Sequence, residues 1–288
     1  MGVAGFVRPK IVFSERCLEY GSFHIENPRR VRRAFEMLME RGYEFVEPEP
    51  AGEEDLLRVH DPEYIRLLKS GDVGDADTPA YEDIYEYARL SAGGAILAAE
   101  INGFSLMRPP GHHAGRLGAA LGAATKGFCY INNIAVAVRR LDRRTLILDI
   151  DGHHGNGTQE IFLGDPRVVY VSLHRHPLYP GTGYYSELNC LNFPLPAECG
   201  EAVYIKTLEE ALKRVDMGEI EVIAVSSGFD AFAGDLASLG LTEKAYGRIG
   251  EILASLGKPT FFVLEGGYIG ENVGKAIDHM LKNFEHPP

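Results

Sequence analysis

The chain has 288 residues, 45% of them hydrophobic and 24% charged, with a formal net charge of −12. This length is near the upper limit for one hydrophobic core, so we expect a single domain over residues 1–288, and the acidic balance argues against direct nucleic-acid binding. Four scattered cysteines, no signal-peptide pattern and no apolar run near the ~18 residues needed to cross a bilayer favour a cytoplasmic protein without a membrane partner.

Short apolar runs alternate with segments of helical spacing. In chain order the predicted strands, of which the first has the weakest pattern, are Phe104–Arg108, Leu146–Ile150, Val168–Leu173, Val222–Ser226 and Thr260–Leu264. The predicted helices are Tyr81–Ile101, Asn132–Leu141, Glu201–Val215, Glu243–Leu256 and Gly270–Phe284. Strands that alternate with helices require right-handed crossovers. We therefore predict an α/β fold with a mostly parallel, multi-stranded sheet flanked by helices on both faces.

Polar and glycine-rich motifs follow the predicted strands. In chain order, the five strand ends run into PPGHHAG, DGHHGNG, HRHPLYPGTG, SGFDAFAGD and EGGY. Ligands of open α/β sheets bind beyond the carboxyl ends of the strands. The sequence therefore predicts one site, at that edge of the sheet, built from histidine, aspartate and tyrosine side chains.

Asp151 and His153 are the first candidates for a metal site. They are two residues apart at a strand end, where an extended backbone points both side chains the same way. With Asp230 as the best third candidate, they suit zinc with one coordination position left for water, and Fe²⁺ can occupy similar ligands. An aspartate at a strand end is also a common turn or cap residue, so the spacing alone leaves a structural role open.

The tandem pair His112 and His113 is the second candidate. Two imidazoles in a core would each need a polar partner. Near a water activated by a metal, they can act as general base and general acid, with Asp149 and Asn156 available to set their tautomers. A metal-binding histidine pair or a solvent loop are the alternatives.

Tyr268 is the third candidate, at the end of EGGY. The two glycines before it permit a close backbone approach or a positive φ, so the phenol can reach into a cleft. A phenol there could stabilise the oxyanion of a tetrahedral intermediate, although a Gly-Gly-Tyr segment is more often only a turn.

Six ordered motifs resemble those of the histone deacetylase superfamily. They are RPPGHHA (108–114), GFCYINN (127–133), DIDGHHGNGTQEIF (149–162), SLHRHPLYPGTG (172–183), SGFDAFAGDLASLGLT (227–242) and LEGGY (264–268). The resemblance extends from about Tyr20, in YGSFHIENPRR, almost to the C-terminus. It implies an arginase/deacetylase-like fold. The HHGNGTQ form is similar to the class II and acetylpolyamine amidohydrolase branches of a superfamily that also contains bacterial and archaeal deacetylase-like and acetoin-utilisation proteins.

The resemblance also implies roles in catalysis. The implied zinc ligands are those chosen above from their spacing: Asp151, His153 and Asp230. His112 and His113 match the pair that activates water and protonates the leaving amine, and Asp149 matches the carboxylate that orients His112. Asn156 stands where many members have a second aspartate, so we expect His113 to remain the general acid. Tyr268 matches the oxyanion-stabilising tyrosine, whereas His154 has no counterpart in the chemistry.

Further positions match substrate and potassium contacts. The implied substrate-binding residues are Phe128, Tyr179, Leu236, Gly266 and Asp77. Phe128 and Tyr179 would form the aromatic walls around the aliphatic arm of the substrate, with Leu236 lower on the wall and Asp77 as a rim carboxylate. The residues implied for a potassium ion are Asp149 and Ser172, with the backbone carbonyls of Asp151, His153 and Leu173.

We therefore expect a zinc-dependent deacetylase that acts on acetyl-lysine in proteins or on a small acetylated amine. Acetylpolyamine hydrolysis is the nearest alternative, although residues 71–94 offer no long inserted loop of the kind those enzymes use to dimerise. A two-manganese ureohydrolase would need more acidic ligands than the sequence offers, and a non-catalytic acyl-lysine binding module would not need every catalytic position filled. The sequence leaves the oligomeric state open.

Overall fold

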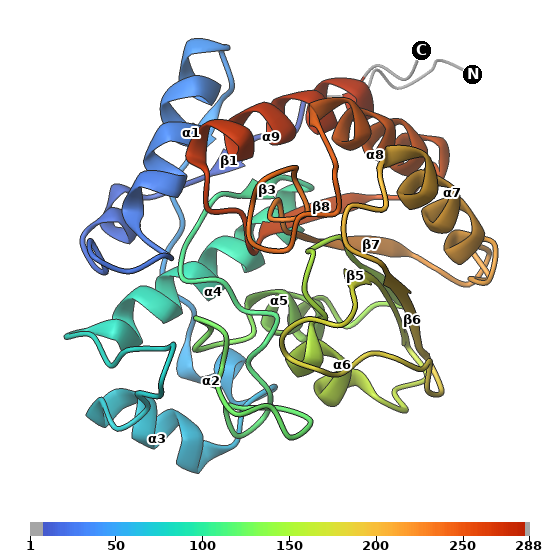
Figure 1. Ribbon diagram of the computed structural model, residues 1–288. Helices are drawn as coiled ribbons and strands as arrows, with labels where there is room; N and C mark the ends of the chain where they lie inside the picture. The colour runs from blue at the N-terminus through green and yellow to red at the C-terminus, as the bar shows by residue number, and fades with distance from the viewer. Residues whose placement is uncertain (1–7, 286–288) are drawn as a thin grey trace.

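The computed structural model describes residues 8–285, so residues 1–7 and 286–288 of the expected domain lie outside the described part. Within it, eight strands form one sheet in the order β2-β1-β3-β8-β7-β4-β5-β6, and every pairing is parallel (Figure 1). The strands are β1 (Ile11–Val12), β2 (Phe45–Val46), β3 (Phe104–Ser105), β4 (Thr145–Asp149), β5 (Val168–Arg175), β6 (Cys190–Leu195), β7 (Val222–Ser227) and β8 (Thr260–Leu264). The predicted parallel α/β sheet is confirmed.

Helices cover both faces of this sheet (Figure 1). They are α1 (Pro28–Glu40), α2 (Glu53–Leu56), α3 (Pro62–Ser70), α4 (Ile84–Ile101), α5 (Asn133–Leu141), α6 (Asn156–Phe162), α7 (Glu201–Leu212), α8 (Glu243–Ser255) and α9 (Gly270–Glu285), with a 3₁₀ turn at Glu15–Leu18. Side chains alternate across each strand, so Leu146 and Leu148 of β4 belong to a hydrophobic cluster with residues of α1, α7, α8 and α9, while Ile147 belongs to a second cluster with residues of α3, α4, α5 and α6. The two hydrophobic layers fix which way each strand end points.

The five predicted helices are present, with shifts at their ends. The α5 helix begins one residue later than predicted because Asn132 is its N-cap, whose side chain accepts a hydrogen bond from the amide of Ala135. The α4 helix begins at Ile84 instead of Tyr81, after Asp83 in a left-handed conformation. No helix within residues 8–285 is both long and apolar enough to cross a membrane.

The strand predictions need larger corrections. The predicted strand Phe104–Arg108 is a strand only at its first two residues, and three strands, β1, β2 and β6, were not predicted. The first two of these have only two residues each, too few for a periodic pattern. The β6 strand contains Pro194, which lacks an amide hydrogen but is tolerated because β6 lies at the edge of the sheet.

Strand register brings the predicted motifs to one edge of the sheet. Asp149 at the end of β4 lies opposite Ser172 of β5 and Ser226 of β7, and Ser226 lies opposite Val263 of β8. Because these four neighbouring strands are parallel, the segments that follow them emerge together. The β3 strand, which precedes the histidine motif, pairs in parallel with β8, so the metal, histidine and tyrosine motifs meet at one edge of the sheet.

Candidate active site

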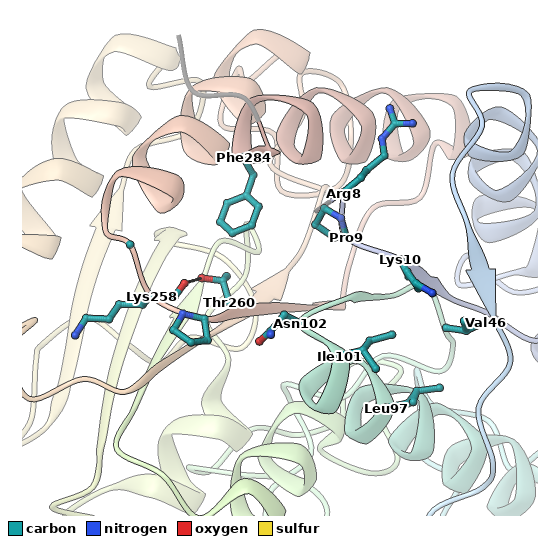
Figure 2. Close-up of a pocket in the computed structure, with 12 residues that line it drawn as sticks. Arg8, Pro9, Lys10, Val46, Leu97, Ile101, Asn102, Lys258, Thr260 and Phe284 are labelled. Carbon is teal, nitrogen blue, oxygen red and sulfur yellow. Dashed lines mark hydrogen bonds between the residues drawn. The ribbon is translucent and has the colours of Figure 1, made fainter. Parts of the chain in front are cut away.

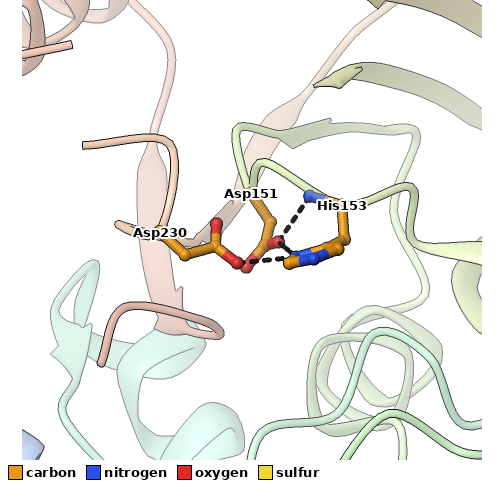
Figure 3. Close-up of side chains that lie close together, drawn as sticks. All are labelled: Asp151, His153 and Asp230. Carbon is orange, nitrogen blue, oxygen red and sulfur yellow. Dashed lines mark hydrogen bonds and ion pairs between the residues drawn. The ribbon is translucent and has the colours of Figure 1, made fainter. Parts of the chain in front are cut away.

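Asp151, His153 and Asp230 form one compact donor cluster, with potential ligand atoms within 4.8 Å of one another (Figure 3). The Nδ1 atom of His153 lies 2.7 Å from Oδ2 of Asp230 and 3.4 Å from Oδ1 of Asp151. Asp230 comes from the segment after β7. Asp151 and His153 come from the segment after β4, which is bent and not extended as expected: the Asp151 carboxylate accepts the amide hydrogen of His153 at 2.8 Å. The structure thus brings together the three residues predicted as metal ligands.

Backbone amides hold the outer oxygens of the two carboxylates. Oδ2 of Asp151 accepts the amide hydrogen of Gly266 at 2.7 Å, and Oδ1 of Asp230 accepts that of Gly152 at 2.8 Å. A Cβ atom at Gly266 would lie 2.5 Å from that Asp151 oxygen, so only glycine permits this approach. The remaining carboxylate oxygens face the imidazole of His153.

The donor cluster fits a divalent cation by its charge as well as its geometry. Both aspartates are fully buried. Burial and the nearby Asp151 carboxylate raise the pKa of Asp230 to about 6, since two adjacent anions in a buried site repel each other. Two carboxylates and one imidazole that leave room for a further ligand are a donor set typical of zinc sites.

The tandem histidines lie beside this cluster, and each has its own polar partner. Nδ1 of His112 is 3.0 Å from Oδ2 of Asp149, and Nδ1 of His113 is 2.8 Å from Oδ1 of Asn156. The Asn156 amide nitrogen donates to the carbonyl of Ala120 at 2.9 Å, so its oxygen must face His113. His113 therefore donates from Nδ1, which leaves Nε2 as the basic nitrogen of the neutral ring.

The two imidazoles differ in their affinity for a proton. Burial would lower the pKa of His112, but the carboxylates of Asp149 and Asp151 raise it to about 10. Burial and the adjacent His112 lower the pKa of His113 well below its ordinary value. The pair therefore contains one imidazole that retains its proton and one that stays neutral.

The Asp149 side chain is fully buried and accepts hydrogen bonds from several neighbouring groups. Besides His112, its Oδ2 accepts a hydrogen bond from the Tyr170 hydroxyl at 2.9 Å, and its Oδ1 accepts the amide hydrogen of Asp151 at 3.2 Å. Ser172 pairs with Asp149 in the β4–β5 register, and Leu173 follows it in β5. Asp149, Ser172 and Leu173, three of the residues predicted to hold potassium, are therefore neighbours in the sheet.

Tyr268 follows the end of β8 and faces the site from the other side. Its ring lies edge-on to Phe128, with centroids 5.8 Å apart. Burial raises the pKa of the phenol well above its ordinary value, so the hydroxyl retains its proton and can donate it in a hydrogen bond. Its backbone amide donates to Asp235 at 2.9 Å, and the next residue, the predicted wall residue Leu236, is 40% exposed.

The two predicted aromatic walls are connected through Asp77. The amide of Phe128, whose φ is +70°, donates to the Thr78 hydroxyl at 3.0 Å, and the Tyr179 hydroxyl donates to the carbonyl of Thr125 at 2.9 Å. The hydroxyls of both threonines donate to the Asp77 carboxylate, one to each oxygen. The Asp77 carboxylate is therefore connected to both predicted walls through the two threonines, and each of its oxygens can accept a further hydrogen bond.

A family model for the histone deacetylase domain matches residues 24–284 of the chain, which includes every residue of this site. The chain belongs to the histone deacetylase family. It is 38% identical to a probable deacetylase of Archaeoglobus fulgidus, over 90% of this chain and 80% of the relative. It is also 31% identical to an acetylpolyamine amidohydrolase of Burkholderia pseudomallei, over 84% of this chain and 86% of the relative.

Histone deacetylase family membership also agrees with the fold. The crystal structure of the HDA15 HD domain superposes with a TM-score of 0.85 at 32% identity, covering 96% of this chain and 88% of that chain. The fold class and the resemblance predicted from the sequence are both confirmed, and the family makes this chain a hydrolytic enzyme of the deacetylase type.

A buried ion-pair network behind Tyr268 was not predicted. Arg30 donates to the carbonyls of Gly267 and Glu265, the residues that precede the tyrosine, and it pairs with Glu26. The Glu26 carboxylate also accepts two hydrogen bonds of 2.8 Å from Arg108. Glu26 and Arg30 lie in HIENPRR, and Arg108 lies in RPPGHHA. The sequence predicted no role for the charged residues of these motifs. The network fixes the turn that carries Tyr268.

Glu265 is a second buried residue that sequence reasoning missed. Its carboxylate accepts the amide hydrogens of Gly111 and His112 at 2.7 and 3.0 Å. Burial raises its pKa to about 7. This one side chain joins the segment that carries the histidine pair to the segment that carries Tyr268.

One well-formed cavity lies away from all of these residues. It has a volume of about 460 Å³ and is lined by the residues before β1, β3 and β8, among them Lys10, Asn102 and Lys258 (Figure 2). It opens at the amino ends of the strands, on the edge of the sheet opposite to the histidine and aspartate cluster. It therefore takes no part in the chemistry of the site.

Proposed function

We propose that this protein is a zinc-dependent, cytoplasmic deacetylase that hydrolyses the acetamide of acetyl-lysine in proteins or of a similar small acetylated amine. One observation carries the proposal: a three-donor cluster, two separately oriented imidazoles and a protonated phenol converge at one edge of the sheet. Amide hydrolysis needs all three elements, because it needs an activated water, proton transfer to nitrogen and stabilisation of an oxyanion.

Asp151, His153 and Asp230 are the residues that would hold the zinc ion, which would supply Lewis-acid polarisation of the acetamide carbonyl. His113 is neutral before reaction, so its Nε2 accepts the proton of the attacking water. The same imidazole then returns that proton to the leaving nitrogen as general acid, as its uncharged partner Asn156 favours. His112, protonated beside Asp149, supplies positive charge to the developing oxyanion.

Tyr268 donates its hydroxyl hydrogen to the same oxyanion. Arg30 prevents the preceding Gly267 carbonyl from turning, so the phenol does not have to be oriented during the reaction. Gly266 keeps Asp151 in place and lines the floor of the site. These residues together position donors for a charge that develops only in the transition state.

The proposed substrate arm lies between Phe128 and Tyr179. Apolar walls suit the methylene stem of acetyl-lysine. Leu236, which was expected lower on the wall, is 40% exposed and would instead extend the same surface toward solvent. Asp77 would accept a backbone amide hydrogen of a peptide substrate at the rim. A potassium ion held by Asp149, Ser172 and backbone carbonyls including that of Leu173 belongs to the same proposal.

Acetylpolyamine hydrolysis is the second candidate function. The net charge of −12 attracts polycations, and the Burkholderia pseudomallei relative carries that activity in its name. Against it, only a short segment separates α3 from α4, with no inserted helix in this described part of the chain. A two-manganese ureohydrolase finds less support, because the described residues contain a single metal-ligating group of this kind.

A substrate panel separates these functions. Acetate release would be compared for acetyl-lysine peptides, acetylputrescine, acetylspermidine and peptides with longer acyl chains, with protein loaded with Zn²⁺ or Fe²⁺ and protein treated with a chelator. We expect the highest kcat/KM for an acetyl-lysine peptide and loss of activity with the chelator. A higher kcat/KM for an acetylpolyamine would favour the second function, and acetate release from no substrate would leave only a binding module.

A further inference from the structure

His154 is the second histidine of DIDGHHGN, and the proposed chemistry does not use it. It is only 1% exposed, and both ring nitrogens have polar partners, one five residues further on in α6 and one in the loop after β5. Nδ1 lies 2.8 Å from the Thr182 hydroxyl, and Nε2 lies 2.9 Å from Oε1 of Gln159. Thr182 belongs to the loop of residues 176–185, three residues after the proposed wall residue Tyr179.

The hydrogen-bond directions at His154 follow from its neighbours. The side-chain nitrogen of Asn192 donates to the carbonyl of Tyr185 at 2.9 Å, so it must also donate in its 2.8 Å contact with Oε1 of Gln159. That Gln159 oxygen is therefore an acceptor, and His154 donates to it from Nε2. Nδ1 of the neutral ring then accepts the hydroxyl hydrogen of Thr182.

His174 makes the matching contact one residue further along the loop. It is 1% exposed, and its Nε2 donates to the carbonyl of Gly183 at 3.0 Å while Nδ1 accepts from the Ser172 hydroxyl at 2.8 Å. The two imidazole rings lie side by side, with centroids 4.7 Å apart. Two adjacent buried histidines, one after β4 and one on β5, thus hold two adjacent residues of the same loop.

Gly183 is packed directly against both rings. A Cβ atom there would lie 2.5 Å from Cγ of His154 and 2.7 Å from Nε2 of His174, and its φ is +77°. On the other side of the same loop, the Tyr179 ring lies edge-on to His113 and His153, with centroids 5.0 and 6.3 Å away. The histidine pair and the wall residue are therefore connected by only a few loop residues.

We infer that His154 and His174 are positioning residues, which hold the loop of residues 176–185 so that Tyr179 stays over the reactive site. The inference rests on the proposed function for the part that Tyr179 plays as a substrate wall. The restraint that the two histidines place on the loop does not depend on that function. His154 thereby has a role in substrate binding that acts through the loop instead of through the metal or the reacting atoms.

Amide hydrogen exchange of the loop of residues 176–185 tests directly whether His154 and His174 restrain it. Thr182→Val, at a partly exposed position, removes the hydroxyl that donates to His154, and His154→Gln removes the acceptor of the same hydrogen bond. Losing one such hydrogen bond should speed exchange of residues 176–186 by about fivefold in each variant. His60→Gln is the matched control, because His60 is also a buried histidine with two hydrogen bonds, to Gly115 and Asn132.

Kinetics test the consequence for the substrate. With an acetyl-lysine peptide, His154→Gln should raise KM about threefold to tenfold and change kcat by less than about twofold. His154→Asn, which places an oxygen where Nδ1 accepts from Thr182, should restore most of the wild-type KM. In a Tyr179→Ala background, His154→Gln should no longer change KM, because the side chain through which it acts is gone.

The outcomes separate the two levels of the proposal. Unchanged loop exchange in both variants, or equal loosening in His60→Gln, would overturn the positioning role. An equal rise in KM with and without Tyr179 would overturn the route through that residue. If the wild-type protein releases no acetate from any substrate, the proposed function fails, and the exchange data alone decide whether the histidines hold the loop.

Discussion

Substitution of Glu26 would measure how much the buried ion-pair network of Glu26, Arg30 and Arg108 contributes to the stability of the fold. Burial alone would raise the pKa of its carboxyl, but Arg108 and Arg30 lower it from 4.5 to about 2. Since the unfolded chain then binds the proton more tightly than the folded chain, the stabilisation is complete above pH 4.5 and is lost as the pH falls toward 2. The difference between the pKa of Glu26 in the unfolded and in the folded chain corresponds to roughly 3 kcal/mol of folding free energy at neutral pH. Roughly 2 kcal/mol of this stabilisation is lost by pH 3.

Glu26→Gln should therefore lower the free energy of unfolding at pH 7 by roughly 3–5 kcal/mol, because two buried guanidinium groups lose their anion. It should also flatten the decline in stability between pH 4.5 and 3. Urea unfolding followed by circular dichroism suits a chain without tryptophan.

Glu63→Gln is the control, since Glu63 makes hydrogen bonds of 2.8 and 2.6 Å to Arg66 on an exposed helix surface. We expect that variant to unfold close to the wild-type midpoint. Equal midpoints for Glu26→Gln and wild type at pH 7, or parallel pH dependences, would refute the reasoning.

Three further predictions concern the proposed chemistry. Tyr268→Phe should lower kcat by about 10²–10³-fold with a much smaller change in KM, and unchanged acetate release would remove Tyr268 from the mechanism. Asp230→Ala should abolish zinc retention, so elemental analysis that finds full zinc occupancy would contradict the ligand assignment. Asn156→Asp places a carboxylate beside His113 and should raise the pKa of that imidazole, which moves the corresponding limb of the kcat/KM–pH profile to higher pH. An unmoved profile would show that His113 does not set that limb.

Local pattern was sufficient for the central strands and for two of the three proposed metal ligands. The apolar runs of β4, β5, β7 and β8 are long enough to show burial on both faces. Asp151 and His153 lie two residues apart just after β4, so a strand-end pattern in the sequence was enough to select them, although the backbone there is bent and not extended. By contrast, β1 and β2 have two residues each and exist because neighbouring strands pair with them. This pairing leaves no periodic pattern in the sequence.

The remaining parts of the site depend on strand order. Asp230 reaches His153 because β7 lies beside β4 in the sheet, although the two residues are far apart in sequence. The sequence alone placed Asp230 at a strand end without showing which strand would be its neighbour. The tertiary structure decided this, because parallel pairing joins segments whose separation in the chain carries no information about their distance.

The same reason separates the two histidines of DIDGHHGN. His153 could be assigned because it stands two residues from Asp151 just after a predicted strand, which is a local feature of the sequence. The one nearby partner of His154, Gln159, does not reveal its role, because Gln159 is itself oriented by Asn192 of β6. The other partner, Thr182, lies in the loop after β5. Sequence alone determined the fold class, the family resemblance and the candidate residues, whereas only the packed sheet decided which side chains hold one another in place.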